Sequence, residues 1–217
     1  MNIDRLYLDE NDIQELFGFF LKWRDISAPH AKENYKEIIG MQGALDLTEK
    51  LGEVFYDNRT LNLGMKHPGR DWYSDFESMM NMFHGKTVHI SFGNDPDWYY
   101  SGRLSIDGYS ARNHELSMSA SVFPFKMAKS KTIISRSINA ANEDASETID
   151  LSGSRLKVSP MITVTTGTGI TLKWGERTVT LDSGSRYVDG LTVGPSGLTI
   201  KAWGTGDLQI SYRVGLL

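Results

Sequence analysis

Five histidines are the residues of this chain best suited to bind a metal or carry a proton, so their spacing is the first test for chemistry. They stand far apart, at His30, His67, His84, His89 and His114. No two are separated by the one or three residues that place paired ligands on one face of a strand or helix. The sequence therefore predicts no zinc site and no other bound metal.

The motifs of other catalytic sites are missing as well. The chain has no cysteine, which excludes disulfides, thiolate metal sites and a Cys–His nucleophile. It also lacks GxSxG, GxGxxG and GxxxxGK followed by Ser or Thr, so neither a nucleophile elbow nor a phosphate-binding loop is predicted. Asp95 and Asp97 flank a proline in residues 94–97, whose composition predicts a turn rather than a calcium loop. We expect no catalytic residue and no cofactor. A glycosidase built from carboxylates that meet only in space stays open as an alternative.

Two tryptophans in the second half offer a different kind of site. Trp174 and Trp203 stand in or beside turn-like sequences, where an exposed indole can stack on a sugar ring. The competing interpretation places both in a hydrophobic core, because tryptophan is largely buried in most proteins. They are the candidate glycan contacts, and a carbohydrate-binding module that recognises host cell-surface glycans is the main alternative function.

The composition is that of a globular protein with one large domain or two small ones. The chain has 217 residues, of which 40% are hydrophobic and 23% charged, with a net charge of −4. Residues 1–127 carry 13 basic and 19 acidic side chains, whereas residues 128–217 carry 10 and 8. This balance argues against a non-specific nucleic-acid surface, which needs a basic stripe. No apolar run long enough to cross a membrane and no signal peptide is present, so we expect no membrane association.

The first half is predicted to mix helices with strands. Residues 12–17 indicate a short helix capped by Asp9 or Asn11. Apolar residues at positions 72, 76, 79, 80 and 83 share one face of a helix, which we expect to pack on a sheet. Strands are predicted over residues 19–23, 56–65, 84–92, 97–104 and 115–122.

A polar stretch, residues 27–36, interrupts these strands. One interpretation is a long surface loop, since long loops in compact domains are often functional or mobile. The other is an arm that reaches a neighbouring subunit. The candidate subunit contacts in this stretch are Ser27, Pro29, Lys32 and Tyr35.

The second half differs in composition from the first, with more Gly, Ser and Thr and with short runs of β-prone residues. Strands are predicted over residues 132–137, 146–151, 161–166, 170–174, 177–181, 186–189, 197–202 and 207–214. Turns are predicted between them, for example at residues 167–169 and 204–206. This spacing is typical of an all-β sandwich with no room for helices. We therefore divide the chain into domains of residues 1–129 and 130–217.

Several motifs, taken in order, resemble the distal tail protein family of siphophages. They are GALDL, YDNRTLNL, HGKTVHISF, WYYSGRL and PFK in the first half, and the final strand of residues 206–213. The resemblance implies a mainly β fold: an α+β tail-hub domain with one clear helix, followed by a galectin-like or carbohydrate-binding-module-like β-sandwich. The chain departs from the family in being short, which predicts no room for an extended arm.

The family resemblance also implies a structural role in the virion. Six copies would form a ring at the tail tip or baseplate, with the tail tube protein above and a tail-associated tip protein below. The protein would be made in the host cytoplasm and assembled into the phage tail. DNA would pass through the axial channel without specific binding, and the acidic first half suits such a channel because negative walls repel phosphate.

Overall fold

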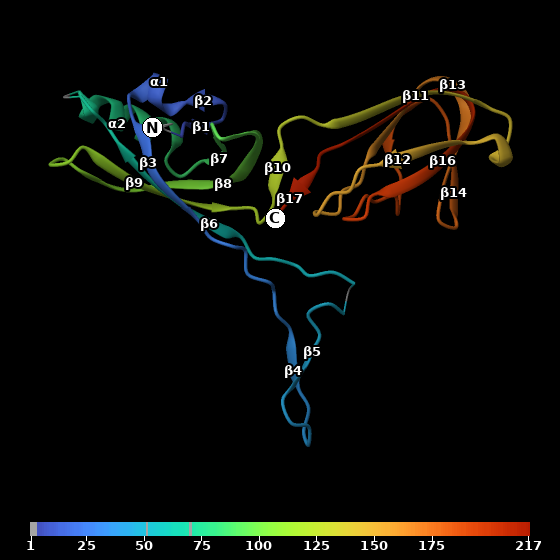
Figure 1. The fold of residues 1–217 in the computed structure, drawn as a ribbon, viewed down its shortest axis with the longest axis horizontal. Coiled ribbons are helices and arrows are strands. Elements are labelled where there is room, and N and C mark those ends of the chain that lie inside the picture. Colours follow the sequence, from blue (N-terminus) through green and yellow to red (C-terminus); the bar gives the residue numbers. More distant parts are fainter. Residues whose placement is uncertain (1–3, 51, 70) are drawn as a thin grey trace. The chain divides into compact units, whose positions relative to one another are not determined.

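Figure 1 shows the fold of the computed structural model, which describes residues 4–50, 52–69 and 71–217. The chain forms two compact units, Met1–Lys126 and Met127–Leu217. Each unit has a hydrophobic core of its own; Leu63 and Met118 belong to the first, and Ile162 and Leu172 to the second. The expected fold class is confirmed, because both units are mainly β and the clear helix lies in the first.

The main sheet of the first unit consists of antiparallel strands that alternate between buried and exposed side chains. Its order is β2 (Asn11–Asp12), β1 (Leu6–Leu8), β7 (Thr87–Phe92), β8 (Asp95–Ser110), β9 (Glu115–Val122), β6 (Arg59–Lys66) and β3 (Phe20–Ile26). In β9, Leu116 and Met118 face the core, whereas Ser117 is exposed on the other face. This period of two is the pattern expected of a sheet with one buried face.

Two helices cover the buried face of this sheet. The predicted amphipathic helix is α2 (Trp72–Phe83), which buries Phe76, Met79 and Phe83. The ring of Phe83 meets Phe17 of the short helix α1 (Ile13–Phe17) edge-on, with centroids 6.2 Å apart. Each helix therefore contributes to the same core as the sheet.

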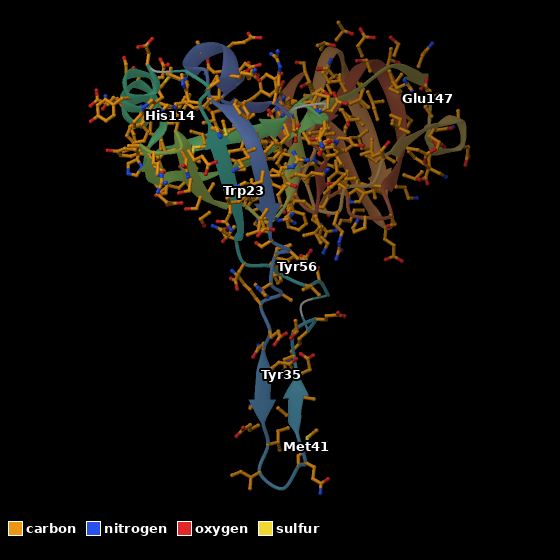
Figure 2. The ribbon with its side chains drawn as sticks, turned by 60° about the vertical axis from the view of Figure 1, so that its left-hand side comes forward. Trp23, Tyr35, Met41, Tyr56, His114 and Glu147 are labelled. Carbon is orange, nitrogen blue, oxygen red and sulfur yellow. The ribbon has the colours of Figure 1, made fainter. Side chains whose placement is uncertain are left out.

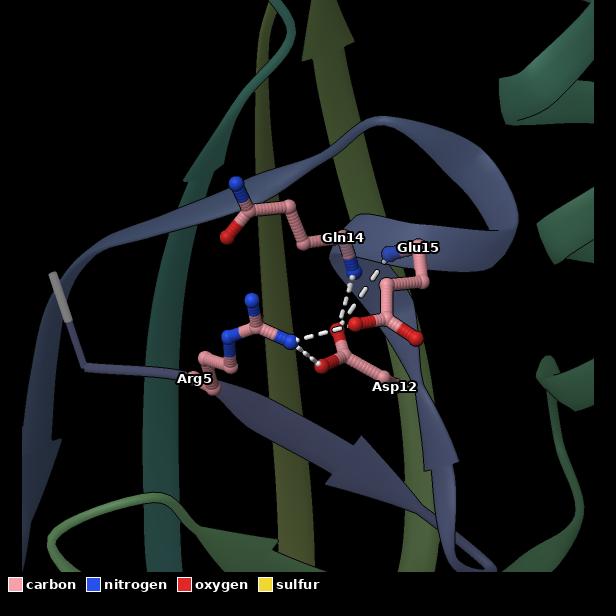
Figure 3. Close-up of polar contacts among 4 residues, drawn as sticks. All are labelled: Arg5, Asp12, Gln14 and Glu15. Atoms are coloured by element: carbon pink, nitrogen blue, oxygen red, sulfur yellow. Dashed lines mark hydrogen bonds and ion pairs between the residues drawn. The ribbon is translucent and has the colours of Figure 1, made fainter.

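The helix α1 forms where the sequence predicts it, but the expected cap was wrong. Asp12 is the N-cap: its carboxylate accepts hydrogen bonds from the backbone N–H groups of Gln14 and Glu15, at 2.9 and 3.3 Å. Figure 3 shows this cap together with Arg5, which contacts the carboxylates of Asp12 and Glu15. Asp9 instead accepts from the backbone N–H of His89. The sheet pairing, which is not local in sequence, thus decides which acid caps the helix.

The turn predicted over residues 94–97 lies elsewhere. Phe92 of β7 pairs directly with Asp95 of β8, so the connection is the two-residue turn Gly93–Asn94. A two-residue connection is the tightest common hairpin. Asp95, Pro96 and Asp97 belong to the strand itself.

The second unit is a six-stranded sheet folded into a sandwich. Its elements are β11 (Thr132–Ala140), η1 (Glu143–Ala145), β12 (Glu147–Leu151), β13 (Met161–Trp174), β14 (Arg177–Leu181), β15 (Gly184–Tyr187) and β16 (Leu198–Tyr212). The early part of β13 pairs with β15, and the later part pairs with β14. Likewise, the early part of β16 pairs with β12 and its later part with β11. The long strands β13 and β16 therefore run through both layers. The short strand β10 (Lys126–Ala128) pairs with β17 (Gly215–Leu216).

Two predicted turns of this unit are wrong. Residues 167–169 lie inside β13 and residues 204–206 lie inside β16, where the register shifts as the paired strands pass between the layers. Gly167 has φ +90°, and a Cβ there would lie 2.0 Å from the carbonyl oxygen of Thr205. Glycine at this point marks a bend with close backbone contact rather than a chain reversal. The 3-10 turn η1 also shows that the unit is not wholly strand.

Candidate assembly surface

Residues 27–50 and 52–58 of the first unit form an arm between β3 and β6. Its outer part is the two-stranded sheet of β4 (Tyr35–Glu37) and β5 (Ala44–Asp46). Figure 2 shows the arm leaving the sheet, with Tyr56 near its base, Tyr35 midway and Met41 at its end. The prediction that the chain has no room for an extended arm was wrong. Of the two interpretations of residues 27–36, the arm geometry is the one observed.

Hydrogen bonds join the two sides of the arm at several points. At the base, Ser27 Oγ accepts from the backbone N–H of Thr60 at 2.9 Å. Farther out, the backbone N–H of Lys32 donates to the carbonyl of Phe55 at 2.8 Å. Beyond that, Leu47 N–H donates to the carbonyl of Asn34 at 2.7 Å, next to β4 and β5. The two sides of the arm are therefore joined at its base, at the isolated bridge between Ala31 and Tyr56, and at the short ladder of β4 and β5.

The four predicted contact residues occupy different places on the arm. Ser27 is bonded to β6 at the base, and Pro29 is half-buried. Lys32 is exposed and lies 3.6 Å from the carboxylate of Asp57. Tyr35 is 57% exposed on β4, and the neighbouring carboxylates of Glu33 and Asp46 raise its pKa. Their role as subunit contacts stays a prediction.

The sequence analysis missed the apolar end of the arm. Residues 38–44, which we call the tip, contain no charged side chain, although three lysines and six acids lie elsewhere in residues 27–58. Ile39 is fully exposed. The large apolar side chains exposed along the arm are Tyr35, Ile38, Ile39, Met41, Leu45 and Phe55. The apolar run contains two glycines, Gly40 and Gly43, and both adopt positive φ in the structure. These glycines are the sequence signal that could have indicated a hairpin end.

An arm of this kind is poorly stabilised by its own chain. A two-stranded hairpin is marginally stable at best in water, and β4 and β5 bury no side chain. Clustered apolar side chains on a soluble protein usually mark a surface that another molecule covers. The arm therefore has the character of one half of an interface.

A hollow on the first unit, which we call the Trp23 hollow, is a second unusual surface. It encloses about 370 Å³, and its lining includes Lys22, Trp23, Gly64, Tyr109, Glu115 and Ser117. Trp23 and Tyr109 are both 49% exposed. The Lys22 ammonium lies 2.7 Å from the Glu115 carboxylate, and this hydrogen bond lowers the pKa of Glu115. The two charges of the hollow thus compensate each other.

The two large aromatic residues of the lining point to opposite faces of the sheet. Tyr109 pairs with the buried Leu116, and its ring packs on the helix side, with its centroid 4.5 Å from Phe76 and 5.4 Å from Trp72. On the exposed face, the Trp23 indole lies directly over Gly64, where a Cβ would come within 2.1 Å of Trp23 Nε1. The Trp23 ring therefore lines the hollow, whereas the Tyr109 ring packs beneath the sheet.

Comparison with known proteins identifies the fold. The sequence matches no protein-family model and no curated protein. Among solved structures it is similar to the Dit protein of phage SPP1, with a TM-score of 0.70 and 16% identity, over 100% of both chains. That protein is described as a paradigm of the hub adsorption apparatus in phages that infect Gram-positive bacteria. The chain has the distal tail protein fold.

Two of the motifs that carried the resemblance, HGKTVHISF and WYYSGRL, lie side by side in β7 and β8. Gly85 of HGKTVHISF donates its N–H to the Leu104 carbonyl at 2.8 Å, and the Arg103 guanidinium of WYYSGRL donates back to the Gly85 carbonyl. Gly102 pairs with Val88 of β7 on one side and with Val122 of β9 on the other, and a Cβ there would lie 2.2 Å from the Ser121 carbonyl oxygen. These residues therefore form part of the scaffold of this fold.

The PFK motif closes the other end of the same scaffold. Lys126 Nζ lies 2.8 Å from the Asp95 carboxylate and 5.2 Å from the ring centroid of Trp98, both at the start of β8. Phe125 is buried and meets Tyr56 of the arm edge-on, with centroids 5.9 Å apart. The motif thus links β8 to the base of the arm.

The two candidate glycan contacts lie in or against the core of the second unit. Trp174 is 8% exposed, and its indole N–H donates to the Gly190 carbonyl at 3.2 Å. Trp203 is half-buried and packs against the same core. Stacking on a sugar needs an open ring face, which Trp174 does not offer. Glycan binding stays a prediction, testable by the loss of glycan-array signal in Trp203→Ala.

The histidines show no catalytic grouping within the described part of the chain. His67 is buried, with Nε2 lying 3.2 Å from the carboxylate of Asp75 on α2 and Nδ1 accepting from Gly69 N–H at 3.0 Å. The described residues include no cluster of three or more His, Cys, Asp or Glu that could hold a metal ion. None of the helices in residues 4–50, 52–69 and 71–217 is long and apolar enough to cross a membrane.

Proposed function

We propose that this chain is a structural protein of a siphophage tail tip, where copies close into a ring around the tail axis. The observation that carries this proposal is the fold match to SPP1 Dit, which spans both chains completely. An alignment that omits no domain on either side supports a shared architecture. The role is structural rather than catalytic, and it places the protein in the virion.

The arm supports assembly into a ring. Rotational rings are built from heterologous contacts, in which two different patches of one chain meet on successive copies. The arm is one such patch, because its apolar side chains lack a partner layer in their own unit. Six copies are the number implied by the family. Residues 1–129 would form the ring, and residues 130–217 would form an attached β-sandwich.

The neighbours and the channel follow from the same proposal. The tail tube protein would bind above the ring and a tail-associated tip protein below it. DNA would cross the axial opening without specific binding, since the 19 acids of residues 1–127 exceed the 13 bases and such a wall repels phosphate. Antibodies raised against the protein should label the tail tip of intact particles; labelling of the head or of the host membrane would contradict the proposal.

Removing the arm tests the ring directly. We would replace residues 29–57 with Asn-Gly, a short turn that suits two antiparallel strands. The wild-type protein should elute from a sizing column as a ring of 24.3 kDa subunits, and the shortened protein should elute as a monomer with unchanged circular dichroism of the body. A ring that persists without the arm would contradict its role.

A pair of double variants provides a matched control. Ile39→Ser with Met41→Ser removes apolar surface from the arm, whereas Ile133→Ser with Tyr187→Ser removes comparably exposed apolar surface from the second unit. We expect the first variant to lose ring assembly and the second to keep it. Equal loss in both would mean that general hydrophobicity, and not the arm, drives association.

A further inference from the structure

We propose that the guanidinium of Arg59 is a binding site for a carboxylate supplied by another molecule. Arg59 is the first residue of β6. Its side chain is only 6% exposed, although arginine is almost never this buried unless it is paired. This inference goes beyond the proposed function, since it needs neither the ring nor the arm.

The strand pairing of β6 directs Arg59 toward the core of the first unit. Arg59 pairs with Val122 of β9, and Leu61 follows on the same face of β6; both of these side chains are completely buried. The guanidinium carbon lies 5.6 Å from the ring centroid of Tyr100, which is also buried. The charge is therefore held among apolar and aromatic side chains, where the loss of water is costly unless an opposite charge replaces it.

The guanidinium has no hydrogen-bond acceptor among the described residues. Arg59 Nε is enclosed and without a partner, and neither Nη group forms a hydrogen bond or ion pair within the described part of the chain. The Nη groups are not enclosed, so an incoming acceptor can reach them. The contact with the Tyr100 ring leaves all the N–H donors unused. A buried polar group without a partner requires an explanation, and a ligand that binds there is one.

Other cations of the first unit show what Arg59 lacks. Arg24 lies 2.6 Å from the carboxylate of Asp4, and Lys126 lies 2.8 Å from that of Asp95, although both cations keep more contact with water. Among the described residues, Arg59 is the one lysine or arginine that is buried. The cation that most needs a carboxylate is therefore the one that its own chain leaves unpaired.

The charge and shape of the site favour a carboxylate over other anions. The two N–H groups of a guanidinium fork match the two oxygens of a carboxylate through parallel hydrogen bonds. Arg59 is a single buried cation, so one negative charge neutralises it, whereas a phosphate dianion would leave an uncompensated charge in the site. Free carboxylate ions and the acidic side chains of other protein chains share this chemistry, and the experiment below separates the two sources.

Thermal unfolding of the monomeric protein in sodium formate and in sodium chloride, at equal ionic strength, tests the site. We would compare the wild type with Arg59→Met, which removes the charge and keeps a flexible apolar side chain. The matched control is Arg112→Met, which removes an exposed arginine of the same unit. Formate at about three times its dissociation constant should raise the unfolding midpoint of the wild type and of Arg112→Met by about 3 °C. It should not raise that of Arg59→Met.

A second readout separates a binding role from a purely structural one. In chloride, Arg59→Met should unfold at the same temperature as the wild type or higher, because an apolar side chain replaces an unpaired buried charge. A large loss of stability in chloride would show that Arg59 serves the fold, and would overturn the site. A wild type that does not respond to formate, or a response that persists in Arg59→Met, would also overturn it.

The assembled protein distinguishes the two sources of the carboxylate. If the formate response of the monomer disappears on assembly, an acidic side chain of another copy occupies the site; if it persists, the site accepts a free carboxylate ion. A wild-type protein that never assembles would contradict the proposed ring, whereas the formate response of the monomer would still decide whether Arg59 is a binding site.

Discussion

The arm of the first unit and the β13–β16 ribbon of the second both contain antiparallel strands and glycines. Their apolar residues differ in exposure: those of the ribbon are buried, whereas those of the arm are exposed. The β13–β16 ribbon buries Ile162, Leu172, Ile200 and Ile210 almost completely. On the arm, Ile39 is fully exposed. The difference is that β13 and β16 bend through two layers that cover each other, whereas β4 and β5 have no second layer in their own unit. A ribbon that lacks an opposing layer needs one from another molecule.

The largest expected consequence concerns amide hydrogen exchange. In the monomeric Ile39→Ser, Met41→Ser variant, amides of β4 and β5 should exchange at rates close to those of an unstructured chain. Amides at the centre of β13 and β16 should exchange only through global opening, which costs about 5–15 kcal/mol in typical domains.

The ring provides the second half of this test. Assembly of the wild-type protein should slow exchange in the arm and leave the β13–β16 ribbon unchanged. Strong protection of the arm in the monomer would show that the arm is stable alone, and the contrast between the two ribbons would then fail.

A smaller effect is expected from the same substitution in each ribbon. Gly167 and Gly43 have similar φ angles, +90° and +79°. A Cβ at Gly167 would lie 2.0 Å from a backbone oxygen, whereas a Cβ at Gly43 would have no atom within 4 Å. Gly167→Ala should therefore destabilise the second unit by about 3 kcal/mol or more, and Gly43→Ala should cost about 1 kcal/mol of local strain.

Urea unfolding monitored by tryptophan fluorescence measures both variants. Because the arm is not expected to unfold with the body, Gly43→Ala should leave the main transition in place. Equal losses in the two variants would mean that backbone conformation alone, rather than the close approach of the strands, sets the cost.

The two ribbons also show what the sequence could and could not predict. Period-two alternation located most strands of the body, because a buried face imposes it locally. Both β13 and β16 contain a Gly-Thr-Gly segment, which the sequence analysis predicted to be a turn. Glycine permits both a chain reversal and a bend within a strand. Only the pairing with a strand that is distant in sequence distinguishes a reversal from a bend, and a local stretch of sequence does not contain this pairing.

The candidate assembly surface was predicted only in part. An arm was one of the two interpretations of residues 27–36, because a polar run between apolar strands indicates a segment outside the core. The apolar tip of the arm, including Ile39 and Met41, was not predicted, since apolar residues look the same in a sequence whether their own chain or another molecule covers them. The Trp23 hollow brings together residues from β3, β6, β8 and β9, so no local pattern indicates it.

The smallest expected effect is a pH dependence that separates the two ribbons again. Hydrogen bonds from the Ser137 and Thr166 hydroxyls lower the pKa of Asp207 in β16. In the arm, the Thr48 hydroxyl and backbone N–H lower the pKa of Asp46 in the same way. A carboxyl whose pKa is lowered by folding adds stability above its unfolded pKa, near 3.8, and this contribution disappears as the pH falls through the folded pKa.

Asp207→Asn should therefore lower the stability of the second unit at neutral pH. The difference in stability between the variant and the wild type should become smaller as the pH drops below about 4. Asp46→Asn should leave the global transition unchanged at every pH, because the arm opens without unfolding the body. Thermal unfolding between neutral pH and pH 3 gives both comparisons. If acid changed the unfolding temperature of Asp46→Asn relative to wild type, the arm would be coupled to the core of its unit. That result would weaken the case that the arm requires a partner copy for stability.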